Sequence, residues 1–161
     1  MREETKPRCV ICDIDNTILD ITHRFHLLDG ENTDWDTFLA EDLIMQDKPM
    51  WDTINVIGCL GKFFPIIFIT GRNEGTRAVS ETQLSQIFNM NPILCGKELY
   101  MRTDRDWRKD TEIKRELYEK HIKDKYHVVA AFDDKSSIID LWRSLGITAY
   151  HVGEIATGDG F

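Results

Sequence analysis

Three short apolar runs, each stopped by polar side chains, constrain the fold of this chain more than any other feature. They are Cys9–Cys12 before Asp13, Ile66–Ile69 before Thr70, and Val128–Phe132 before Asp133. Runs of this length and composition are typical of buried strands. The segments between them carry apolar residues at helical spacing, and strands that alternate with helices form mainly parallel sheets. We therefore predict an α/β fold with helices on both faces of the sheet.

The same patterns locate the other elements. Strands are predicted over 8–14, 65–69, 126–132 and 147–152, with short candidates at 93–94 and 99–101. Helices are predicted from Pro49 to Phe64, through Val79 to Phe88, from Thr111 to Ile122 and from Ile138 to Leu145. The region of about 20–48 holds polar turns and a short helix start that Asp34 could cap. A length of 161 residues suits one domain, so we expect residues 1–161 to form a single domain with a small helical insertion at about 20–48.

Polar side chains at the strand ends point to one site. Ligands of parallel sheets bind beyond the carboxyl ends of the strands, where Asp13, Thr70 and Asp133 are expected to meet. Asp13 and Asp15 are close enough to repel each other, which favours a bound cation. Asp133 and Asp134 end a buried strand and also need a partner. A carboxylate near a metal can act as a nucleophile, and its neighbour as a proton carrier.

Composition and charge exclude several classes of protein. With 42% apolar and 30% charged residues, the chain is typical of a folded protein. No apolar run approaches the ~18 residues of a membrane span, and the charged amino terminus has no apolar signal core, so we expect a cytoplasmic protein. A net charge of −8 argues against tight, unspecific binding to a polyanion, although a local basic patch is compatible with it.

Two familiar motifs are rejected on geometry. Cys9 and Cys12 are spaced like a metal or redox pair, but three residues apart on a strand they would face opposite sides of the sheet. We interpret them as buried free thiols. The stretch Gly58–Lys62 has its glycines too close for a phosphate-binding P-loop, and no Ser or Thr follows the lysine. We interpret it as a helix end.

The strand-end residues, in their order along the chain, resemble the haloacid-dehalogenase (HAD) superfamily of phosphotransferases. The matching parts are Asp13-x-Asp15-x-Thr17, Thr70, Lys114 and Asp133-Asp134. The resemblance implies a Rossmann-like sheet. It also implies that the insertion at about 20–48 is a cap over the site, and a short cap would leave the site open to a large substrate.

The resemblance also implies a role for each site residue. Asp13 would attack phosphorus and form an aspartyl-phosphate, and Asp15 would protonate the leaving oxygen and then activate water. Thr70 would bind a phosphoryl oxygen, and Lys114 would hold the charge of the nucleophile and of the transferring group.

A Mg²⁺ ion is the cofactor that the resemblance implies. Its ligands would be Asp13, a backbone carbonyl near Asp15, and Asp133, Asp134 or both.

A closer resemblance covers the second half of the chain. The matching residues are Tyr100–Arg102, Asp106 with Arg108–Asp110, Lys114, Phe132–Asp134, Trp142-Arg143 and Gly158–Phe161. Together they look like the phosphatase domain of phage-type polynucleotide kinase-phosphatases, which removes 3′-phosphates from nucleic acid ends. No kinase half is visible. The resemblance implies that Arg72, Arg102 and Arg108 bind substrate.

The basic residues also fit a second interpretation. Arg102, Arg105, Arg108 and Lys109 alternate with acidic residues, and alternating signs usually indicate surface ion pairs. The pairing partners would be Asp104, Asp106 and Asp110. A second group, His23, Arg24 and His26 in the insertion, could face the site, but we favour ordinary surface residues there.

Three functions remain in competition. The leading one is a Mg²⁺-dependent phosphomonoesterase acting on a phosphorylated nucleic acid 3′-end. The second is a phosphatase of nucleotides or small metabolites, with DNA, RNA and mononucleotide all open as substrates. The third is a catalytically silent module that binds nucleic acid ends, against which the acid–base residue Asp15 argues.

Overall fold

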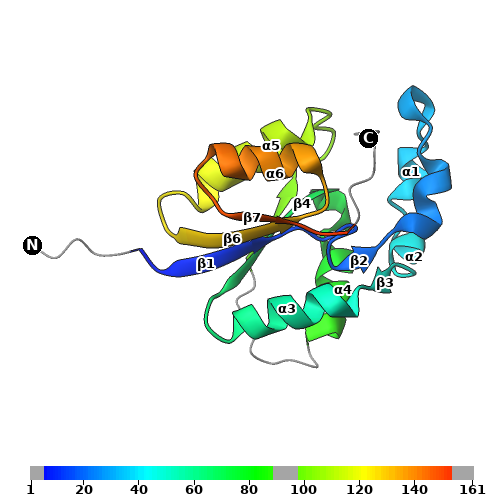
Figure 1. Ribbon diagram of the computed structural model, residues 1–161. Coiled ribbons are helices and arrows are strands. Elements are labelled where there is room, and N and C mark those ends of the chain that lie inside the picture. Colours follow the sequence, from blue (N-terminus) through cyan, green and yellow to red (C-terminus); the bar gives the residue numbers. More distant parts are fainter. Residues whose placement is uncertain (1–5, 89–97, 154–161) are drawn as a thin grey trace, which may run out of the picture.

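A five-stranded parallel sheet forms the centre of the computed structural model, which describes residues 6–88 and 98–153 (Figure 1). The strand order is β5-β4-β1-β6-β7. The strands are β1 (Arg8–Cys12), β4 (Ile66–Asn73), β5 (Glu98–Arg102), β6 (His127–Asp133) and β7 (Ala149–His151). The predicted mainly parallel α/β sheet is confirmed.

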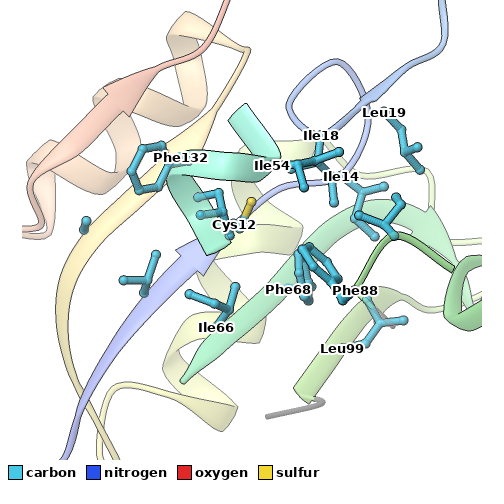
Figure 2. Packing of buried hydrophobic residues seen from close by; sticks show 14 of the residues in the cluster. Cys12, Ile14, Ile18, Leu19, Ile54, Ile66, Phe68, Phe88, Leu99 and Phe132 are labelled. Atoms are coloured by element: carbon cyan, nitrogen blue, oxygen red, sulfur yellow. The ribbon is translucent and has the colours of Figure 1, made fainter. Parts of the chain in front are cut away.

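Helices cover both faces of the sheet, as predicted (Figure 1). The bounds are α3 (Trp51–Gly61), α4 (Arg77–Phe88), α5 (Asp110–His121) and α6 (Ser136–Ser144), and a short 3-10 helix, η3 (Glu74–Thr76), precedes α4. The α3 and α4 layer packs against one face, where Ile54 and Phe88 join a cluster with Phe68 (Figure 2). The α5 and α6 layer covers the other face, where Trp142 is fully buried.

Strand β1 divides its side chains between the two layers. Val10 and Cys12 belong to the cluster under α3 and α4, whereas Cys9 and Ile11 belong to the cluster under α5 and α6. The two cysteines therefore face opposite sides of the sheet, which confirms the rejection of a paired cysteine site. Burial, together with the nearby charge of Glu98, raises the pKa of Cys9 to about 12, so this thiol stays protonated.

Short helices fill the insertion between β1 and α3. A two-stranded antiparallel ribbon of β2 (Leu19–Asp20) and β3 (Lys48–Pro49) closes its base. The helices are η1 (Thr22–Leu27), η2 (Gly30–Asn32), α1 (Trp35–Phe38) and α2 (Glu41–Ile44). Asp34 caps α1, as predicted, because its side chain accepts a hydrogen bond from the Thr37 amide. We call this segment, residues 20–48, the cap; it lies beyond the carboxyl end of β1 (Figure 1).

Two boundaries near the cap differ from the prediction. Strand β1 ends at Cys12 rather than at residue 14, because the carbonyl of Ile14 accepts the amides of Thr17, Ile18 and Leu19 in a tight turn. Pro49 was expected to open a helix. It lies in β3 instead, since the ribbon pairs it with Leu19, and α3 begins two residues later.

Strand β4 is longer than the predicted 65–69. It continues to Asn73 because β5 follows it past a bulge between Thr70 and Asn73. Two further expectations, the strand at 93–94 and the matching end at 158–161, fall outside the described residues. Within 6–88 and 98–153, every helix is too short or too polar to cross a bilayer.

Candidate active site

The strand order brings the predicted site residues to one edge of the sheet. Strand β1 lies between β4 and β6, so Asp13, Thr70 and Asp133 stand at the carboxyl ends of three adjacent strands. The amide of Asp13 extends the ladder by donating to the carbonyl of Phe132 at 3.0 Å. All three residues are buried, with exposed fractions of 5% or less. Burial of so much polarity requires partners from elsewhere in the chain.

Lys114 is the partner of two of these carboxylates. It lies on α5 beside the buried Ile113, and its Nζ donates to Asp13 Oδ1 at 2.7 Å and to Asp133 Oδ2 at 2.6 Å. Burial alone would lower the pKa of Lys114, but the charges of Asp13 and Asp133 outweigh it and raise the pKa above its usual range. The side chain is therefore a fixed positive charge between β1 and β6.

One lysine does not neutralise the whole cluster of acids. Carboxylate oxygens of Asp13, Asp133 and Asp134 lie within 4.8 Å of one another. Burial raises the pKa of Asp13 to about 7 despite the opposing charge of Lys114, and burial with the charge of Asp13 raises that of Asp134 to about 6. A divalent cation with oxygen ligands would offset this repulsion, so the donor set fits Mg²⁺.

Asp15 belongs to a different set of partners. Arg72 Nε donates to both of its oxygens at 3.0 and 3.1 Å, and Arg24 Nη2 approaches Oδ1 at 3.4 Å. Burial would raise the pKa of Asp15, but the charge and hydrogen bonds of Arg72 outweigh it and hold the pKa below its usual range. The carboxylate of Asp15 thus faces the arginines and is outside the three-acid cluster. Its predicted part in metal binding stays a prediction that rests on its backbone carbonyl.

The arginines that hold Asp15 are themselves held by Asp47, at the end of the cap. Arg24 donates to the two oxygens of Asp47 at 2.9 and 3.0 Å, and Arg72 Nη2 donates at 2.8 Å. His23 Nε2 is 2.9 Å from the same carboxylate. The side chains of Arg24 and Asp47 are fully buried, and that of Arg72 is 1% exposed. This charge network, Asp15, Arg24, Asp47 and Arg72, is buried except at Asp15 and links the cap to the site.

Sequence reasoning named Asp15 and Arg72 as site residues but missed the parts that Arg24 and Asp47 play. We interpreted Arg24 as an ordinary surface residue, and that interpretation is wrong, because the cap folds it inward over the ring of Phe38. Asp47 was not singled out at all. The only signal was the group of His23, Arg24 and His26, which had been noted as a candidate cluster facing the site.

Thr70 and Arg72 occupy consecutive inward positions of β4. The hydroxyl oxygen of Thr70 accepts the Arg72 amide at 3.2 Å and keeps its proton to donate. The guanidinium of Arg72 is fully engaged, because Nη1 also donates to Ser80 and to Gln83, at 3.1 and 2.7 Å. Its predicted contact with substrate stays a prediction, and in this structure the side chain acts on Asp15.

The charged loop 102–109 folds on itself, in line with the pairing interpretation. Arg102 pairs with Asp110, and its Nη1 donates to the carbonyls of Asp106 and Arg108, each at 2.7 Å. Arg108 pairs with Asp106 and with Glu116. Asp110 also pairs with Lys135, and the backbone amide of Lys135 donates a hydrogen bond to the carboxylate of Asp133. These contacts connect the loop to the site. Substrate contacts of Arg102 and Arg108 stay predictions.

Comparison with known proteins identifies relatives of the whole chain. The family model for the phosphatase domain of polynucleotide kinase PNKP matches residues 7–159. A protein of Autographa californica nuclear polyhedrosis virus that carries the name bifunctional polynucleotide kinase/RNA ligase is 29% identical over 149 residues. That alignment covers 91% of this chain and 19% of the viral protein.

Solved structures also include relatives that cover most of this chain. Chains from two structures of a Pnkp1/Rnl/Hen1 complex, one titled an RNA repair complex, are each 27% identical to this chain, with TM-scores of 0.69 and 0.72. They cover 94% and 93% of this chain, which spans 44% and 47% of theirs. The class C acid phosphatase of Bacillus anthracis shares the fold at 16% identity and a TM-score of 0.56, with 90% of this chain and 62% of that one covered. The chain therefore spans less than half the length of its more similar relatives.

Proposed function

Because this chain belongs to the family of polynucleotide kinase PNKP phosphatase domains, which are phosphatases of HAD type, we propose that it removes 3′-phosphates from nucleic acid ends through an aspartyl-phosphate. The observation that carries the proposal is the double contact of Lys114 with Asp13 and Asp133 at the edge where three parallel strands end. A permanent cation at that position stabilises an attacking carboxylate and the phosphoryl oxygens that approach it.

In the first step, a carboxylate oxygen of Asp13 attacks phosphorus. A bond forms between that oxygen and phosphorus while the bond from phosphorus to the 3′-oxygen of the nucleic acid breaks. The leaving 3′-oxygen takes a proton from Asp15. Arg72 favours the ionised form of Asp15, so Asp15 has to gain this proton as the negatively charged phosphate approaches and raises its pKa.

In the second step, a water molecule attacks phosphorus and gives a proton to Asp15. The bond between phosphorus and Asp13 breaks, which releases inorganic phosphate and restores both carboxyl groups. The ionised form that Arg72 favours suits this step, because the carboxylate must accept a proton. The hydroxyl of Thr70 donates a hydrogen bond to a phosphoryl oxygen in both steps.

We propose Mg²⁺ as the cofactor, held by Asp13, by Asp133, Asp134 or both, and by the backbone carbonyl of Asp15. The ion would lessen the repulsion between an anionic phosphate and the cluster of Asp13, Asp133 and Asp134. Turnover should therefore stop in excess chelator and return with Mg²⁺. Ca²⁺ should restore less, because it takes more ligands at longer distances. Full activity in chelator would remove the metal from the proposal.

The size of the cap and the names of the relatives support the proposed substrate. We propose that residues 1–161 form one phosphatase domain in which the short cap leaves room for a chain end. Relatives named for polynucleotide kinase, RNA ligase and RNA repair support an end-processing role beside such activities.

The decisive experiment uses an oligonucleotide whose 3′-phosphate carries a ³²P label. The wild-type chain should release labelled phosphate with a higher kcat/KM than it shows for a 3′-mononucleotide, and it should leave a 5′-phosphate intact. Acid quenching during turnover should trap label on the protein in a hydroxylamine-sensitive form. Asp13→Asn should show neither label nor turnover while keeping its thermal midpoint. Equal kcat/KM for oligonucleotide and mononucleotide would favour the small-molecule phosphatase instead.

A further inference from the structure

Two exposed tryptophans from distant parts of the chain lie against each other. Trp35 opens α1 in the cap, and Trp107 lies in the charged loop before α5; their ring centroids are 6.0 Å apart with the planes tilted by 49°. Trp35 is 41% exposed and Trp107 is 71% exposed. A tryptophan normally buries most of its large apolar surface, so this pair costs stability unless something covers it.

A chain of side-chain contacts links Trp35 to the proposed proton carrier, Asp15. The Trp35 ring meets the Phe38 ring edge-on, with centroids 5.7 Å apart. The guanidinium of Arg24 lies over the Phe38 ring, 4.5 Å from its centroid. Arg24 in turn reaches Asp15. Only two side chains therefore separate Trp35 from the proposed proton carrier.

Trp107 is connected to the sheet through its neighbours in the chain. Trp107 lies between Asp106 and Arg108, whose carbonyls both accept from Arg102. Arg102 Nε also donates to the carbonyl of Gly71, next to Thr70, at 3.0 Å. Trp35 and Trp107 thus meet where the cap contacts the loop that follows β5, one ring from each.

The surroundings of Trp107 suit a charged, aromatic-rich ligand. Arg105 and Arg108 flank it; Arg108 already pairs with Asp106 and Glu116, whereas the exposed Arg105 forms no ion pair with any described residue. Exposed aromatic rings beside cationic side chains are how proteins bind single-stranded nucleic acid, because each base offers a flat face for stacking and each phosphate a negative charge. Arg105 can therefore meet a phosphate beside the exposed ring of Trp107, and this favours nucleic acid as the occupant.

We propose that Trp107, supported by Trp35, is a stacking site for an unpaired nucleobase near the 3′-end of the substrate. The inference rests on the proposed function and adds to it the recognition of a base beyond the terminal phosphate. Trp107 offers the open ring face, and Trp35 holds that ring in place from the cap. Stacking tolerates any base, so affinity should depend on the presence of an unpaired base more than on its identity.

The test compares Trp107→Ala and Trp107→Phe on three substrates. These are a single-stranded 3′-phosphorylated octanucleotide, the same strand with abasic sites before its terminal nucleotide, and p-nitrophenyl phosphate. For the intact strand, Trp107→Ala should raise KM about ten-fold with kcat nearly unchanged. Trp107→Phe should recover most of the loss. With the abasic strand and with p-nitrophenyl phosphate, the wild type and both variants should agree within about two-fold.

A matched control comes from the opposite edge of the sheet. Phe63 is 77% exposed and lies three residues before the first residue of β4, so Phe63→Ala removes a similar exposed ring at the end of the sheet away from the carboxyl ends of the strands. It should leave every substrate unaffected. Trp35→Phe, which keeps a ring against Phe38, should raise KM for the intact strand less than Trp107→Ala does.

Binding separates this proposal from the proposed function. Titration with a 3′-hydroxyl octanucleotide should quench tryptophan fluorescence in the wild type and much less in Trp107→Phe. Quenching without turnover of any 3′-phosphate would keep the stacking site and overturn the 3′-phosphatase. Turnover that Trp107→Ala leaves unchanged, or lowers equally for all three substrates, would overturn the stacking site and keep the phosphatase.

Discussion

Two groups of arginines border the site, and they are built in opposite ways. Arg24 and Arg72 are buried, and their carboxylate partners lie 9 to 57 residues away in the chain. Arg102 ends β5 and Arg108 lies in the loop that follows it, and their acidic partners lie within eight residues. A buried ion pair carries a large desolvation cost, whereas an exposed pair contributes little and is screened by salt. We therefore expect function to depend on the buried arginines, Arg24 and Arg72.

The sharpest way to break this comparison is to change Arg72 to Lys. A single ammonium cannot span Asp15, Asp47 and Gln83 as the planar guanidinium does. We expect turnover of a 3′-phosphorylated oligonucleotide to fall by about 100-fold or more, since Asp15 loses its orientation. The free energy of unfolding should also fall by roughly 3 kcal/mol, because buried charges lose their partner. Wild-type kcat in a folded Arg72→Lys variant would show that Asp15 needs no such support.

A smaller effect is expected for Asp47→Asn, which keeps the shape and removes the charge that holds Arg24 and Arg72. If the network acts by positioning Asp15 as a proton donor, the loss depends on the leaving group. We expect kcat for a 3′-phosphorylated oligonucleotide to fall about ten-fold and kcat for p-nitrophenyl phosphate much less, because nitrophenolate leaves without protonation.

The control for that variant is Asp36→Asn, an exposed acid on α1 in the same cap. It should change neither rate. Equal losses on both substrates in Asp47→Asn would indicate general damage to the cap, and the positioning role of Asp47 would be wrong.

The smallest effect is expected for Arg108→Ala. The side chain is half exposed and pairs with Asp106 and Glu116, so the thermal midpoint should not change measurably. At low salt, kcat/KM for the oligonucleotide should fall about two- to five-fold, and this difference should vanish at high salt. Hydrolysis of p-nitrophenyl phosphate should be unchanged. A loss as large as that of Asp47→Asn would reverse the ranking of the two arginine groups.

Much of the fold could be predicted because its signals are local. Apolar runs indicated the strands, and their alternation with helices indicated a parallel sheet with both faces covered. The spacing of Cys9 and Cys12 predicted their opposite faces, and Asp34 was correctly identified as a cap. The errors at Pro49 and at the end of β4 arose where a partner strand overrode local preference: β3 pairs Pro49 with Leu19, and β5 extends β4 past Thr70.

The sequence by itself determined which edge of the sheet would hold Asp13, Thr70 and Asp133, because parallel strands present their carboxyl ends together. Only the tertiary structure decided what each side chain faces. Lys114 meets Asp13 across 101 residues, and the cap carries Asp47 inward to Arg72. Contacts over such separations depend on how helices and loops pack on the sheet. The spacing of residues along a chain carries no record of that packing.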